Sequence, residues 1–226
     1  MSYKFMKIAT AAIILLSGTM LFAAGLTDNS GLADNAGEIN GQIIYIEGEA
    51  TLNGAAAELG NTVKPGDQIT TGTASTVEIA FGEQNILQFQ ENSDVVIQAD
   101  WAGIELKQGI VAGVLNKLKS IGISKENPFT VNTELTVMAV RGTSFFIHNG
   151  VPGNVYHCTC NGEIQYESSD GNIVETVEAN HHNPVMFFKD ESGILQREDA
   201  SGYNYHDDDS MNAVAAKVNT SIPWKD

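Results

Sequence analysis

The sequence is poor in basic residues, in cysteine and in long apolar runs. Lysine and arginine number 12 against 28 aspartates and glutamates, and the 226-residue chain has a formal net charge of −16. Such an acidic chain repels phosphate backbones, so no nucleic-acid partner is expected. The only long apolar run lies at the N-terminus, which excludes a protein with several membrane spans. Apolar residues still make up 42% of the chain, enough for a hydrophobic core, so wholesale disorder is excluded.

The first residues have the pattern of a secretory signal. Lys4 and Lys7 precede an apolar run over residues 8–24, which ends in small residues suited to cleavage. We therefore expect a signal peptide over residues 1–24 and a flexible leader over residues 25–40. After cleavage no membrane span remains, and the protein would be periplasmic or secreted. The alternative is an uncleaved anchor, for which the apolar run is only marginally long enough.

After the leader, the chain consists of many short runs rich in β-branched and aromatic residues. Turn residues such as Pro65-Gly66 and Asn161-Gly162 lie in nearly every gap between the runs. Many short strands at close spacing are typical of an all-β fold, here an antiparallel β-sandwich or roll. The expected strands lie in residues 43–46, 77–81, 86–89, 95–97, 104–106, 129–131, 136–140, 145–147, 155–160, 173–177 and 185–188.

Helical patterns are few. Residues 112–121 have apolar side chains at helical spacing, and a short C-terminal helix is predicted to begin at Ser210, a good N-cap. We expect a β domain over residues 41–150, a β extension with the cysteines over 151–190, and a tail with the short helix over 191–226. The division after residue 150 rests on a break that could instead be a hairpin connection within one sheet.

Several turn and strand motifs follow one another in a recognisable order. The order begins with Gly48-Glu49-Ala50 and continues with the stretch from Lys64-Pro65-Gly66-Asp67 to Thr70-Thr71-Gly72 and with residues 77–81. Leu106-Lys107-Gln108-Gly109 comes next, and Val140-Arg141-Gly142-Thr143-Ser144-Phe145 ends the order. This order resembles the FecR domain, the periplasmic part of the iron-dicitrate signalling regulators, which also occurs alone in exported proteins. The resemblance covers residues 41–148.

The resemblance implies an exported binding or signalling module of the cell envelope, without catalysis. Its partner would be an envelope protein, a glycan or a small ligand. A self-associating structural protein of the envelope is an alternative. Only three residues precede Lys4, so we expect no cytoplasmic anti-sigma segment. Neither direct sigma-factor regulation nor iron-dicitrate sensing is therefore carried over.

The conspicuous residues of these motifs have an architectural character. We expect Gly72 and Gly142 to lie where no Cβ is tolerated. Arg141 is expected to pin two loops by bidentate hydrogen bonds to carbonyls or a carboxylate, and the alternative is an anionic ligand. The sequence contains no Gly-x-Ser-x-Gly elbow, phosphate loop or dinucleotide fingerprint, so no enzyme activity is predicted.

The two cysteines form the only constellation with metal or redox chemistry. In a strand over residues 155–160, Cys158 and Cys160 project from the same face. A direct disulfide would require a distorted strand, whereas two parallel thiolates can close on one metal ion. His181 and His182 follow in the chain and, being adjacent, face opposite ways in a strand, so one of them could join. Two cysteines with one or two histidines suit zinc or reduced copper, so a metal-binding or redox protein that uses Cys158, Cys160, His181 and His182 is the alternative to the binding module.

Other interpretations of the same residues stay open. The cysteine pair could be a strained disulfide, two small buried side chains or half of an intermolecular link. His181 and His182 could be exposed loop residues. Exposure is expected more strongly for His148, His157 and His206.

Overall fold

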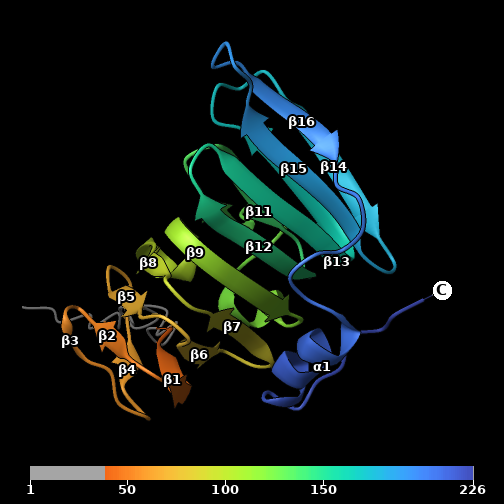
Figure 1. The fold of residues 1–226 in the computed structure, drawn as a ribbon. Helices are drawn as coiled ribbons and strands as arrows, with labels where there is room; N and C mark the ends of the chain where they lie inside the picture. Colours follow the sequence, from red (N-terminus) through yellow and green to blue (C-terminus); the bar gives the residue numbers. More distant parts are fainter. Residues whose placement is uncertain (1–38, 226) are drawn as a thin grey trace, which may run out of the picture. The chain divides into compact units, whose positions relative to one another are not determined.

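The computed structural model describes residues 39–225, within which 16 strands and one α-helix follow in chain order (Figure 1). The predicted signal peptide and nearly all of the predicted leader lie outside these residues. No helix within the described part is both long and apolar enough to cross a membrane.

The strands are β1 (Gly41–Glu47), β2 (Ala50–Leu52), β3 (Ala55–Ala56), β4 (Thr62–Val63), β5 (Gln68–Thr71), β6 (Thr76–Phe81), β7 (Asn85–Phe89), β8 (Asp94–Ile97), β9 (Gly103–Leu115), β10 (Phe129–Asn132), β11 (Thr136–Val140), β12 (Ser144–Val151), β13 (Asn154–Ser168), β14 (Val174–Ala179), β15 (Asn183–Lys189) and β16 (Leu195–Asp199). Two short 3-10 turns, η1 (Ala99–Trp101) and η2 (Leu118–Ile121), lie on either side of β9, and α1 (Asp208–Ala216) follows the last strand.

The strands form two sheets that share the long strands β9 and β13. The first sheet has the order β4-β1-β6-β7-β9-β12-β13-β15-β16 and is antiparallel throughout. The second has the order β3-β2-β5-β8-β9-β10-β11-β13-β14, in which only the β9–β10 pair is parallel. The predicted all-β fold with a C-terminal helix is confirmed.

The predicted turn at Asn161-Gly162 is wrong, because β13 runs through it. Residues 154–161 of this strand pair with β12 and β15 in the first sheet, and residues 162–168 pair with β11 and β14 in the second. Gly162 has a φ of 110° where the strand passes from one sheet to the other. The Asn-Gly pair therefore marks a change of sheet inside one strand. The break at residues 151–153 is the hairpin connection between β12 and β13.

The helix predicted over residues 112–121 is also wrong, because β9 extends to Leu115. Val111 and Leu115 face the main core between the two sheets, and Ala112 and Val114 face a second apolar cluster on the outer side of the first sheet. A strand covered on both faces has a continuous apolar run, which does not alternate and so imitates a buried helix.

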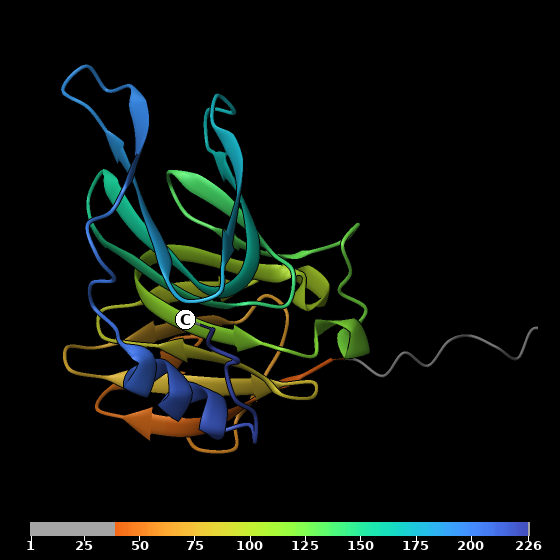
Figure 2. The same cartoon turned by 90° about the vertical axis from the view of Figure 1, so that its right-hand side faces the viewer.

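The second apolar cluster is formed where α1 covers the first sheet (Figures 1 and 2). Met211, Val214 and Ala215 of the helix are buried against Ile86 of β7 and Val114 of β9. The helix begins at Asp208, two residues before Ser210, the predicted N-cap. Its N-cap is Asp207, whose carboxylate accepts a hydrogen bond from the Ser210 amide at 2.8 Å, while the Ser210 hydroxyl accepts from the Asp207 amide at 3.0 Å. Ser210 thus completes a capping box.

The motif glycines differ in what they require. Gly142 has a φ of 82°, but no atom lies closer than 3.8 Å to the position of a Cβ. Glycine is therefore favoured at this position by the backbone conformation and not by lack of space. A Cβ at Gly72 would lie 3.4 Å from Glu49, an ordinary contact, so the expectation that no Cβ is tolerated there is wrong. Gly109 combines both requirements, because its φ is 105° and a Cβ would lie 2.3 Å from the Cα of Ser93.

Gly109→Ala is expected to lower the free energy of unfolding by about 3 kcal/mol, since left-handed strain and a clash with backbone add together. Gly153→Ala is the matched control, because Gly153 has a φ of 75° with open space at the Cβ position. It should cost only about 1 kcal/mol. Urea denaturation of both variants measures the difference, and equal losses would contradict the close approach at Gly109.

Candidate metal centre

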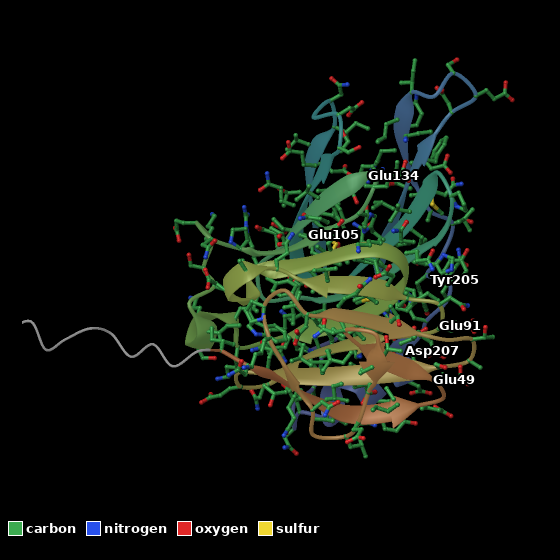
Figure 3. The ribbon with its side chains drawn as sticks, turned by 90° about the vertical axis from the view of Figure 1, so that its left-hand side faces the viewer. Glu49, Glu91, Glu105, Glu134, Tyr205 and Asp207 are labelled. Carbon is green, nitrogen blue, oxygen red and sulfur yellow. The ribbon has the colours of Figure 1, made fainter. Side chains whose placement is uncertain are left out.

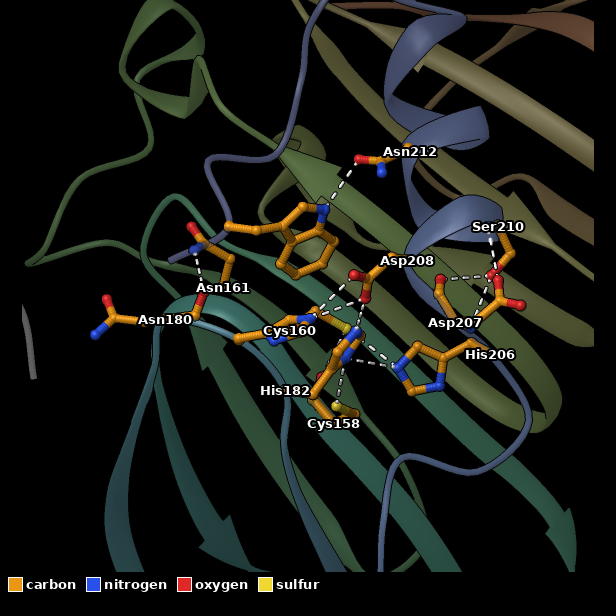
Figure 4. Close-up of polar contacts among 12 residues, drawn as sticks. Cys158, Cys160, Asn161, Asn180, His182, His206, Asp207, Asp208, Ser210 and Asn212 are labelled. Carbon is orange, nitrogen blue, oxygen red and sulfur yellow. Dashed lines mark hydrogen bonds and ion pairs between the residues drawn. The ribbon is translucent and has the colours of Figure 1, made fainter. Parts of the chain in front are cut away.

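Four metal-binding side chains from three separate segments meet at one point on the outer face of the first sheet (Figure 4). Cys158 and Cys160 come from β13, His182 from the turn between β14 and β15, and His206 from the loop before α1. Their donor atoms all lie within 4.8 Å of one another. Of the predicted ligands, the structure thus brings together both cysteines and His182.

The distances between the donor atoms suit a tetrahedral ion. Cys158 Sγ lies 3.4 Å from His182 Nδ1, Cys160 Sγ lies 3.4 Å from His206 Nε2, and the two imidazole nitrogens are 3.2 Å apart. A tetrahedral zinc ion with Zn–S bonds of about 2.3 Å and Zn–N bonds of about 2.0 Å separates its nitrogens by about 3.3 Å and a sulfur from a nitrogen by about 3.6 Å. The four donors therefore surround a space of the size of a zinc ion.

Strand geometry explains the position of the two thiols. Cys158 and Cys160 are fully buried and belong to the second apolar cluster together with Tyr156, as the alternation along β13 predicts. Val155 projects from the opposite face into the main core. Both cysteines are free thiols in the structure, so the predicted alternative of a direct disulfide is not formed.

His182 is held in place by its backbone and by two aromatic rings. Its φ is 41°, in the left-handed region, and its amide donates a hydrogen bond of 2.9 Å to the carbonyl of Cys160. The ring stacks on Tyr203, with centroids 4.3 Å apart, and on Trp224, at 5.0 Å. The side chain is 1% exposed. The turn that carries His182 is therefore built against β13, and the imidazole faces the thiols.

His206 is the ligand that the sequence did not predict. It was expected to be exposed, but its ring stacks on Phe146 of β12 with centroids 4.3 Å apart. It lies 46 residues after Cys160 and beyond β16, a strand that no sequence pattern predicts. No local spacing connects it to the cysteines, so only the folding of the C-terminal segment over the sheet brings it to the site.

Hydrogen bonds on the far side of each ring fix which nitrogen faces the thiols. His206 Nδ1 donates to the carbonyl of Asn204 at 2.8 Å, which leaves the Nε2 lone pair facing inward. His182 Nε2 lies 2.9 Å from the carboxylate of Asp208, so that nitrogen carries the proton and Nδ1 faces inward. Partners of this kind, a carbonyl and a carboxylate behind the ligating imidazoles, are usual around protein-bound metals.

The surroundings also promote ionisation of one thiol. Burial raises the pKa of Cys158, but hydrogen bonds with Cys160, His182 and His206 outweigh burial and lower it to about 4. Burial, with the nearby Cys158, raises the pKa of Cys160 well above its ordinary value. Burial lowers the pKa of His182, but its contacts with Cys158 and Asp208 raise it overall. The lowered pKa of Cys158 favours the thiolate form that binds a metal ion.

His181 has a different place from the one predicted. Its Nε2 lies 3.0 Å from an Asp208 carboxylate oxygen that also contacts His182 Nε2. These three side chains form a second group of potential ligands. The carboxylate of this second group, Asp208, is 41% exposed, so the group is less enclosed than the four donors. The contact of Asp208 with His182 directs that imidazole towards the thiols. His181 thus supports the carboxylate that positions His182, and His206 takes the fourth place among the donors.

The remaining histidines lie apart from the four donors. His157 is fully buried in β13, not exposed as expected, and its Nε2 lies 2.9 Å from the hydroxyl of Thr136. Burial lowers its pKa to about 3, so the ring is neutral at physiological pH. His148 stacks on Tyr205, with centroids 4.4 Å apart.

Arg141, for which the sequence predicts either a pin between two loops or an anionic ligand, makes two side-chain hydrogen bonds to a single neighbouring strand. Its Nη1 donates to Glu163 at 2.6 Å and its Nη2 donates to Gln165 at 2.8 Å, and both acceptors lie on β13. Arg141 itself follows β11, the neighbour of β13 in the second sheet. The two hydrogen bonds therefore tie the bend after β11 to the adjacent strand. The Nε donor of Arg141 is buried without a partner among the described residues.

Comparison with known proteins agrees with the order of the motifs. Residues 67–174 match the family model described as FecR protein. Two crystal structures of a protein of Parabacteroides distasonis ATCC 8503, provisionally described as an anti-sigma factor, are similar at 11% and 10% sequence identity, with TM-scores of 0.46 and 0.47. Each similarity covers 59% of this chain and 60% of that one. No curated protein matches the chain. The resemblance to the FecR domain is therefore confirmed over residues 67–174, a range that begins and ends later than the expected residues 41–148.

Proposed function

We propose that this FecR-domain protein is an exported, non-catalytic module of the cell envelope that binds one zinc ion through Cys158, Cys160, His182 and His206. The observation that supports the proposal best is the meeting of these four donors at tetrahedral distances from three segments far apart in the chain. FecR domains belong to regulators and not typically to enzymes, which agrees with a module that transmits a signal or binds a partner.

The donor set favours a structural zinc ion. Two thiolates and two imidazoles are a usual ligand set of structural zinc sites, in which all four positions are taken by the protein. The burial of both sulfurs and of His182 leaves no place for a substrate or an activated water. Reduced copper also accepts thiolate and imidazole ligands. Metal analysis distinguishes the two ions.

The ion would fasten the C-terminal segment to the FecR domain. Cys158 and Cys160 lie within residues 67–174, whereas His182 and His206 follow that range. Apart from the donors, the segment before α1 is held by few polar contacts, among them a 3.0 Å hydrogen bond from the Asn204 amide to the Tyr156 hydroxyl. A metal–ligand bond at His206 would therefore contribute much of what keeps this segment on the sheet.

Export is proposed from the basic start and the apolar run over residues 8–24. Cell fractionation with N-terminal sequencing tests it. The mature protein should appear in the envelope or the medium and begin near residue 25. Recovery from the cytosol with residues 1–24 attached would contradict it.

The purified reduced protein is expected to carry one zinc ion per chain, measured by native mass spectrometry and elemental analysis. Cys158→Ser/Cys160→Ser and His206→Ala should lose it, because each removes donors from the first coordination sphere. His148→Ala is the matched control, since His148 lies outside the donor set, and should keep the ion. Full occupancy in His206→Ala with loss in His181→Ala would contradict the assignment of the fourth ligand.

Removal of the ion by a chelator should loosen the segment before α1. Amide hydrogen exchange is expected to become faster in residues 201–208 and in the turn at residues 180–183. Residues of β6, remote from the site, should not change. The Cys158→Ser/Cys160→Ser variant should resemble the chelated protein without any chelator. Equal protection of residues 201–208 with and without metal would contradict the fastening role.

A further inference from the structure

A second site lies at the end of β9, where basic side chains gather around one pocket of an otherwise acidic molecule. The pocket has a volume of about 770 Å³ and lies between η2, the loop that follows it and the bend after β11. Four of its lining residues are basic and one is acidic: Lys117, Lys119, Lys125, Arg141 and Glu163. This local excess of positive charge contrasts with the net charge of −16 of the chain.

No salt bridge in the described part of the chain neutralises the three lysines, although Glu126 follows Lys125 and attracts its charge. Among residues 39–225, the salt bridges of lysine involve Lys189 and Lys217, and none involves a lysine of the pocket. The lysines of the pocket are exposed, so their ammonium groups are free to turn towards a bound molecule. None of the acidic side chains labelled in Figure 3, such as Glu49, Glu91 and Glu105, lines the pocket. The pocket is therefore a place where an anion gains attraction that the rest of the surface opposes.

Arg141 supplies a fixed cation at the edge of the pocket. Its bonds to Glu163 and Gln165 hold the guanidinium in one orientation, and its Nε donor has no partner in the described part of the chain. The pairing with Glu163 neutralises part of the charge at this side. The lysines therefore provide most of the positive potential of the pocket, and Arg141 forms one wall of it with a side chain held in a fixed orientation.

The floor of the pocket is apolar. Leu118 and Ile123 line it and are both buried, whereas Ser120 and Ser124 add hydroxyl groups. A compact anion alone would leave the apolar floor without a contact, whereas an anion with a small apolar body would cover it. Three lysines that line one pocket can together bind a doubly charged group with several acceptor oxygens, which a phosphate monoester offers and a single carboxylate does not.

We propose that this pocket binds a small organic phosphate monoester, with the phosphate among Lys117, Lys119 and Lys125 and the ester group over Leu118 and Ile123. The site is separate from the metal centre and shares no residue with it. It also gives the Arg-Gly-Thr motif of the FecR domain a place at a ligand pocket, because Arg141 and Gly142 both line it.

Isothermal titration calorimetry of the full chain with phenyl phosphate, inorganic phosphate and benzoate tests the proposal. Phenyl phosphate should bind most tightly, and inorganic phosphate should bind several-fold more weakly because it leaves the apolar floor uncovered. Binding of benzoate as tight as that of phenyl phosphate would overturn the phosphate class. Absence of binding by phenyl phosphate would overturn the site.

Charge variants separate a specific site from general attraction. Lys117→Gln/Lys119→Gln/Lys125→Gln should weaken phenyl phosphate binding at least tenfold. The control Lys64→Gln/Lys107→Gln/Lys189→Gln removes the same charge from exposed positions elsewhere and should leave the affinity within twofold. Equal weakening in the two triple variants would overturn the proposal. Circular dichroism and zinc content, unchanged in both variants, exclude loss of fold or of the metal centre as the cause.

Discussion

Two imidazole nitrogens face each other at 3.2 Å beside two thiol sulfurs, and this arrangement is the constraint on which the C-terminal half of the molecule depends. The carbonyl behind His206 and the carboxylate behind His182 take the far nitrogens of both rings, so both inward nitrogens offer lone pairs. Two lone pairs and a thiolate at this distance repel one another without a cation between them. A metal ion would replace this repulsion by four metal–ligand bonds. A proton on His182 would relieve only part of the repulsion, because it binds one donor and not all four.

The site also connects the range that matches the FecR family with the segment that follows it. The two thiols belong to a strand of the FecR domain and are placed by simple alternation along β13. The imidazoles come from the segments that follow, one from a tight turn and one from the loop before α1. A metal ion bound by donors divided in this way would make the docking of the C-terminal segment depend on the ion. The apolar contacts of Met211 and Val214 and the ion pair of Lys217 with Glu78 would hold α1 in addition.

The sequence was informative where structure is local and failed where it is not. Alternation predicted the common face of Cys158 and Cys160, and adjacency predicted that one histidine of the pair would join them. His206 could not be found in this way, because its position follows from the packing of α1 and from stacking on Phe146. The same limit explains the wrong helix over residues 112–121. A strand covered by a core on one face and by a helix on the other has no periodicity by which to recognise it.

X-ray absorption spectroscopy at the zinc edge tests the central claim most directly, because it counts the ligand types around the ion in the intact protein. The account predicts two sulfur ligands at about 2.3 Å and two nitrogen ligands at about 2.0 Å. A spectrum with only nitrogen and oxygen ligands would contradict it, because the ion would then lie elsewhere and the two thiols would have no metal to bind.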